Sequence, residues 1–144
     1  MPTKRPVYLD RRLTVCALCY CLCFSEEEFH GELKRLNIPR GDWPRFIPGT
    51  HGNASTHLLD PATVGDRKRP PVAIVCIEGG RLNEYSGSQI AALLCHEAVH
   101  IWQAHARRIG AFNDHGDEEE AYAIQGLTQS LLEECARYLS MDVK

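Results

Sequence analysis

The sequence contains no long hydrophobic run and no marked excess of either charge. Its longest apolar stretch, 13–24, spans twelve residues, whereas a membrane-spanning helix needs about 18 or more. The formal net charge of −3 gives no electrostatic footprint for nucleic acid. Three short basic clusters, at 4–5, 11–12 and 67–69, are scattered, and we interpret them as solvated surface before phosphate-contact surface. Internal repeats are also lacking. We therefore expect no membrane span, no nucleic-acid partner and no repeat architecture.

What the sequence does contain suits one globular domain over residues 1–144. Hydrophobic residues make up 44% and charged residues 24%, which is ordinary globular usage, and this length closes one core but is short for two. Seven cysteines, an odd number, favour a reducing compartment, so we expect a cytoplasmic protein. Secretion is the alternative, because Arg11 and Arg12 before the apolar stretch resemble a signal peptide. Asp10 and the lack of a cleavage site argue against it.

Three segments have the pattern of strands. The continuous apolar run from Leu13 to Phe24 predicts a strand that is buried on both faces and central to a sheet. Val72 to Ile77 predicts a second buried strand. Between them, 40–71 is rich in turn residues and contains one short strand candidate, from Ser55 to Leu59. The sequence thus predicts a small sheet of about three strands.

Three helices are predicted by their capping residues. Ser25 and Glu28 form a capping box that begins a helix ended by Pro39. Ser86 and Gln89 begin a longer helix that runs to about residue 108, before a glycine at 110. A last helix follows over 117–139. With the sheet, these helices predict an α+β fold.

The chemistry lies in the long helix, at His96-Glu97-Ala98-Val99-His100. His96 and His100 are one helical turn apart, so both imidazoles project from one face and can hold one zinc ion. Glu97 then flanks the metal as a general base, not as a ligand. Such a pattern also arises by chance, but a carboxylate in a helix that is otherwise apolar would be costly without a function.

A catalytic zinc takes three protein ligands and a water, so a third ligand is needed. The candidates are Glu120, His115 and Glu118. The acidic run that begins the last helix is explained by the preference of carboxylates for helix N-termini. That preference does not explain why Glu120 falls on the same side of the helix as Leu127, facing the core. We favour Glu120 and keep the other two open.

The pattern of His96, Glu97 and His100 followed by Glu120 resembles the gluzincin peptidases, in which a glutamate of the next helix completes the zinc site. The strings 91–103 and 120–125 look like small zincin-like proteins of tailed phages and prophages, over most of the chain. The resemblance implies a minimal zincin-like fold with an active-site helix and a following ligand helix. It also implies Zn²⁺ as cofactor and a metallopeptidase acting on a peptide or protein in the cytoplasm of a bacterial host.

Two other families match the sequence less well, and two other functions remain open. Metzincins need a third histidine six residues after the second, whereas His105 is five away, and Gln103 stands where they need glycine. Spartan-type proteases use a histidine about where His115 stands, which fits better, but no convincing basic DNA-binding surface accompanies it. A non-catalytic phage structural or assembly protein stabilised by zinc remains open. So does a zinc hydrolase that acts on something other than peptide.

Other positions are assigned lesser roles. Tyr122 or His105 could stabilise an oxyanion, or be an ordinary surface residue, and Trp102 and Gln103 are expected to pack and to support the site. Cys19, Cys21 and Cys23 share one strand face, and no second cysteine pair or nearby histidine completes a metal site, so we interpret them as core. An exposed sheet edge beside the metal helix could bind substrate as an added strand.

Overall fold

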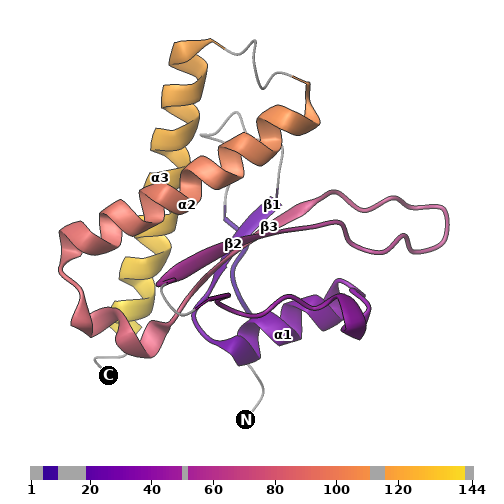
Figure 1. Cartoon of the computed structure of the whole chain (residues 1–144), viewed down its shortest axis with the longest axis horizontal. Coiled ribbons are helices and arrows are strands. Elements are labelled where there is room, and N and C mark those ends of the chain that lie inside the picture. The colour runs from indigo at the N-terminus through magenta and orange to yellow at the C-terminus, as the bar shows by residue number, and fades with distance from the viewer. Residues whose placement is uncertain (1–4, 10–18, 50–51, 111–115, 142–144) are drawn as a thin grey trace.

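The computed structural model describes residues 5–9, 19–49, 52–110 and 116–141. The fold is α+β, as predicted, with one three-stranded mixed sheet followed by two long helices (Figure 1). The elements in chain order are β1 (Cys19–Cys23), α1 (Glu26–Arg35), a 3-10 helix (Arg40–Asp42), β2 (Ala54–Leu59), β3 (Val72–Ile77), a 3-10 helix (Gly79–Glu84), α2 (Gly87–Arg108) and α3 (Asp117–Met141). None of the helices in these ranges is long and apolar enough to cross a membrane.

The strand order of the sheet is β1-β3-β2. β3 pairs in parallel with β1 and antiparallel with β2, and the parallel pairing is possible because α1 and β2 lie between the two strands in the chain. The prediction that 13–24 forms the central strand is therefore wrong, because β3 holds that place. Its described part, β1, lies outside β3 and is buried nonetheless; residues 13–18 lie outside the described ranges.

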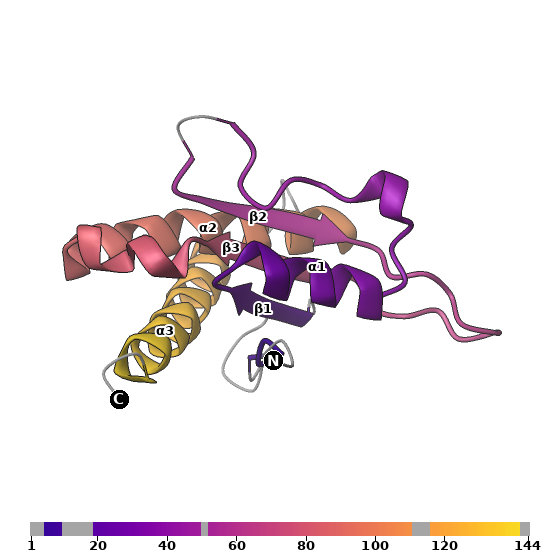
Figure 2. The same cartoon turned by 90° about the horizontal axis from the view of Figure 1, so that it is seen from below.

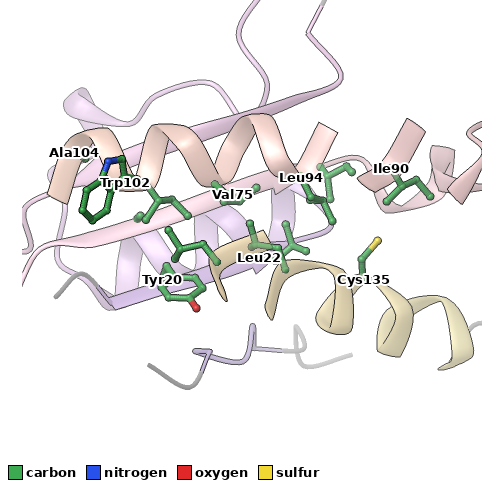
Figure 3. Packing of buried hydrophobic residues seen from close by; sticks show 14 of the residues in the cluster. Tyr20, Leu22, Val75, Ile90, Leu94, Trp102, Ala104 and Cys135 are labelled. Carbon is green, nitrogen blue, oxygen red and sulfur yellow. The ribbon is translucent and has the colours of Figure 1, made fainter. Parts of the chain in front are cut away.

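The sheet separates two hydrophobic layers. Successive side chains of β3 point to opposite faces, so Val72 and Ile74 pack with Phe29 of α1, while Ala73 and Val75 pack with α2 and α3. Figures 1 and 2 show α1 on one side of the sheet and the two long helices on the other. Figure 3 shows the second layer, in which β3, β1, α2 and α3 all contribute side chains. Because both faces are covered, β3 is buried along its whole length.

The predicted helix caps are confirmed with one difference. The Ser25 hydroxyl accepts a hydrogen bond from the Glu28 backbone N–H at 3.1 Å, but the Glu28 carboxylate accepts from the N–H of Phe24 instead of Ser25. Ser86 and Gln89 make both bonds of the capping box. These bonds satisfy N–H groups that have no partner inside the helix, and they fix where α1 and α2 begin.

The end of α2 is also as predicted. Gly110 follows the helix with φ of +71°, a left-handed conformation that glycine adopts without steric cost. α3 packs against α2, and buried residues of both helices share one core. The outer face of α2 is consequently free to line a site, since its inner face is fixed by packing on β3 and α3.

Candidate metal and active site

His96 and His100 lie on the outward face of α2, and both are exposed. Their Nε2 atoms are 3.1 Å apart, with the ring planes at 77° to each other. Two nitrogens bound to one tetrahedral zinc at about 2.0–2.1 Å would be separated by roughly 3.3 Å. The pair therefore fits a single metal ion. A hydrogen bond between two neutral rings would have a similar length.

Gln103 orients the second histidine. Its side-chain oxygen lies 3.3 Å from Nδ1 of His100, which favours the tautomer with the proton on Nδ1. Nε2 then keeps its lone pair and can bind a metal, as in many metal sites where the other ring nitrogen is hydrogen-bonded. The supporting role expected of Gln103 is consistent with this contact, and Trp102 is buried in the core, as expected.

Glu97 is buried between α2 and β2, with 3% of its surface exposed. Its Oε2 atom accepts a hydrogen bond of 2.5 Å from the hydroxyl of Thr56 in β2. This bond holds the carboxylate against the strand and beside both histidines of its own helix. Sequence reasoning missed Thr56, and no signal could have identified it, because a threonine in a short strand is unremarkable until the strand is placed against α2.

A cleft runs between α2 and the outer side of β2. One cavity of about 510 Å³ lies toward the start of α2 and is lined by Tyr85 and Leu93 among others; a second, of about 340 Å³, extends past His100. His96 and Glu97 line both. β2 is at the edge of the sheet, with no strand outside it in the described ranges. The candidate chemistry thus lies beside an edge strand that has no further strand paired to it in the described ranges.

The third ligand is not found among the described residues. No group of three His, Cys, Asp or Glu side chains within these ranges is arranged to hold a metal ion. His115 falls in the segment 111–115, outside them. In α3, Glu118 is exposed, whereas Glu120 is half-buried on the side of the helix that carries the buried Leu127, as the helical wheel predicted. Ligation by Glu120 stays a prediction.

Neither candidate for oxyanion stabilisation lines the cleft. His105 is 4% exposed and packs against Trp102 with 5.5 Å between ring centroids. Burial lowers the pKa of its imidazole, and the nearby Glu119 carboxylate acts in the opposite direction. Tyr122 is 64% exposed on α3. Both belong to other surfaces of the two helices, so an oxyanion role gains no support at either position.

The strand cysteines behave as core residues. Cys21, Cys23 and Cys76 are fully buried in the layer beneath α1. Hydrogen bonding to Cys21, together with burial, raises the pKa of the Cys23 thiol, and burial raises that of Cys76. Raised pKa values keep the Cys23 and Cys76 thiols protonated and unreactive, and the burial of Cys21 and Cys23 agrees with the prediction that they belong to the core.

Comparison of the chain with protein-family models, with curated proteins and with solved structures finds no match. The likeness to gluzincins therefore rests on the residues of the two helices alone.

Proposed function

We propose that this protein is a zinc-dependent hydrolase, and specifically a metallopeptidase, with His96 and His100 as zinc ligands and Glu97 as general base. The observation that carries the proposal is the convergence of the two Nε2 atoms, 3.1 Å apart, beside a buried carboxylate at an open cleft. Imidazole nitrogens are good zinc ligands. A catalytic zinc also keeps one coordination position for water or substrate, and the open cleft gives both access to the histidine pair. Glu120 is the third ligand that we propose.

The roles of the side chains follow from their contacts. When bound, zinc acts as a Lewis acid that makes water a competent nucleophile near neutral pH. Thr56 engages Oε2 of Glu97, so Oε1 is the atom that would take a proton from the attacking water. The same carboxyl group would then deliver the proton to the amine that leaves the cleaved peptide bond. Gln103 keeps His100 in the tautomer that binds metal.

The shape of the cleft favours an extended peptide as substrate. The cavities extend from the histidine pair in both directions along β2, and an edge strand offers backbone groups to which a peptide can pair as an added strand. Such binding recognises the peptide backbone and leaves side-chain preference to the cavity walls. A compact small molecule would need only one of the two cavities.

Glu120 is partly withdrawn from solvent and Glu118 is exposed, and Glu120 is the candidate that matches the gluzincin pattern. His115 is the alternative and would make the site similar to that of the Spartan-type proteases. Zinc content should be measured for Glu120→Ala, Glu118→Ala and His115→Ala variants after dialysis. Loss in Glu120→Ala alone supports the gluzincin-like assignment. Loss in His115→Ala alone replaces it with the Spartan-like one.

The activity can be tested by incubating the zinc-loaded protein with a complex peptide mixture and identifying the products by mass spectrometry. We expect new termini that disappear with a chelator and with Glu97→Gln, while the exposed Glu84→Gln variant cleaves as the wild type does. Cleavage by Glu97→Gln at the wild-type rate would contradict the proposal. If the wild type cleaves no peptide and Glu97→Gln keeps its biological effect, the non-catalytic zinc-stabilised protein is the better account.

A further inference from the structure

Three arginines from distant parts of the chain meet at a third cavity, which shares no lining residue with the two beside the histidine pair. The cavity has a volume of about 250 Å³ and is lined by Arg5, Arg35 and Arg69, together with Tyr8 and Cys19 among others. Arg5 and Arg69 come from basic clusters that look scattered in the sequence. Folding gathers them beside the last residue of α1, Arg35.

One carboxylate accompanies the three guanidinium groups, and it is already satisfied. Glu32 is 2% exposed, and its Oε2 accepts hydrogen bonds from the Tyr8 hydroxyl at 3.0 Å and from Nε of Arg35 at 2.9 Å. Its Oε1 lies 3.4 Å from Nε of Arg5. Glu32 does not line the cavity, and no Asp or Glu does among the described residues.

Arg69 is the least committed of the three. Its guanidinium makes one long hydrogen bond, 3.5 Å from the backbone carbonyl of Arg35. Arg5 is largely exposed and shares Glu32 with Arg35. The described surroundings of the cavity therefore carry three positive charges against one negative charge, which leaves two positive charges over.

Such an excess, in a small cavity with partly apolar walls, matches a doubly charged oxyanion. A phosphate monoester carries about −1.5 to −2 charges at pH 7, and guanidinium groups bind its oxygens in a bidentate manner. Leu36, Pro61 and Val72 form the apolar part of the wall. The volume is below the roughly 300 Å³ at which sites for whole drug-sized ligands begin, so it suits a phosphate group.

We propose that this cavity binds the phosphate group of a small phosphate monoester, held by the guanidinium groups of Arg5, Arg35 and Arg69. Arg35 and the Tyr8 hydroxyl are fixed by Glu32 and by a 2.9 Å hydrogen bond to each other. Arg5, whose side chain is 63% exposed beside Glu32, and Arg69, with its long hydrogen bond, can turn toward the ligand. The site does not depend on the proposed hydrolase activity, since it shares no lining residue with the cleft beside His96.

The test is isothermal titration of the full chain with inorganic phosphate at pH 7.5, with a chelator present so that metal-bound phosphate does not contribute. We expect saturable binding with one site per chain, weakened at least about tenfold in Arg69→Gln and in Arg5→Gln because each loses charge-assisted hydrogen bonds. The matched control is Lys68→Gln, which removes the same charge from an exposed neighbour that does not line the cavity. It should bind as the wild type does.

Arg35→Gln is not a suitable variant, because it would leave the buried Glu32 with less compensation and endanger the fold. Circular dichroism of the two other arginine variants should match the wild type. The absence of saturable binding would overturn the proposal. So would equal weakening by Lys68→Gln, which indicates a diffuse basic surface. A short single-stranded oligonucleotide that displaces phosphate at lower concentration than phosphoserine would also overturn it, in favour of a nucleic-acid surface.

Discussion

Of the three buried glutamates, Glu32 lies near one edge strand of the sheet and Glu97 near the other, and their surroundings differ. Glu32, near β1, receives hydrogen bonds from Tyr8 and Arg35 and an ion pair from Arg5. Glu97, near β2, receives one side-chain hydrogen bond, from Thr56, within the described ranges. Burial of a carboxylate is costly unless partners compensate it. The partners of Glu32 therefore explain its burial by a structural role. Glu97 has fewer partners, and its Oε1 atom can still interact with a water or a substrate.

The two edges of the sheet also differ, in whether another segment pairs with them. On the outer side of β1, the backbone N–H of Leu9 donates to the carbonyl of Tyr20 at 3.1 Å, and Tyr8 bridges to Cys21. The outer side of β2 instead faces the cleft beside His96. Open edges invite unwanted pairing and are usually covered. That the open edge adjoins the histidine pair is what we would expect if it receives a substrate.

The largest effect should come from Glu97→Gln, which keeps the shape of the side chain but removes the base. We expect kcat/KM for peptide cleavage to fall by about 10²–10⁴, with zinc content and melting temperature close to wild type. Steady-state kinetics with one peptide identified by mass spectrometry would measure this. A fall of less than tenfold would mean that Glu97 resembles Glu32 in being structural.

The reciprocal change, Glu32→Gln, should affect stability instead. It removes the charge that Arg35 and Arg5 share, so we expect a loss of about 2 kcal/mol in the free energy of unfolding, measured by urea denaturation. Peptide cleavage and zinc content should be unchanged below the transition. A loss of activity in the folded variant would break the distinction between the two glutamates.

Thr56→Val sharpens the account of how Glu97 is held. The substitution deletes the one side-chain donor to the carboxylate and keeps a β-branched residue in the strand. We expect kcat/KM to fall by about tenfold, the equivalent of one hydrogen bond to a charged group, while zinc content is retained. Thr56→Ser should restore most of the activity. Equal activity of the valine and serine variants would show that the bond does not position the base.

The smallest effect concerns another buried ionisable group, His105. Because burial lowers the pKa of its imidazole in the folded state, the unfolded chain binds the proton more readily. Stability should therefore decline as the pH falls below about 6.5, the unperturbed value, with Glu119 moderating the decline. The unfolding free energy of His105→Gln, measured from pH 7.5 to 5.5, should depend less on pH than that of wild type. Identical slopes would exclude this contribution.

Local signals predicted most of the fold. Capping residues such as Ser86 and Gln89 located helix starts because they bond within their own turn, and the apolar run 72–77 located β3. The strand order could not be predicted, because a long apolar run indicates burial on both faces but not a central place in the sheet. β1 is buried by α1, α3 and the segment at Tyr8 although it is not the central strand.

In the candidate site too, local features could be predicted from the sequence and tertiary contacts could not. The proximity of His96 and His100 could be predicted, because residues four apart lie one helical turn from each other. The partial burial of Glu120 could be predicted from the helical wheel in the same way. The contact of Thr56 with Glu97 spans 41 residues and depends on the packing of β2 against α2, which no local pattern encodes. The meeting of Arg5 with Arg69 is likewise a product of tertiary structure.

The most direct measurement is the zinc content of the purified, dialysed protein by elemental mass spectrometry. We predict about one zinc ion per wild-type chain, as for a mononuclear site, the same for His30→Ala, whose imidazole lies on α1 far from the pair in sequence, and a loss of zinc in His100→Ala. A wild-type protein without stoichiometric zinc, or a His100→Ala variant that retains it, would contradict the assignment of His96 and His100 as metal ligands.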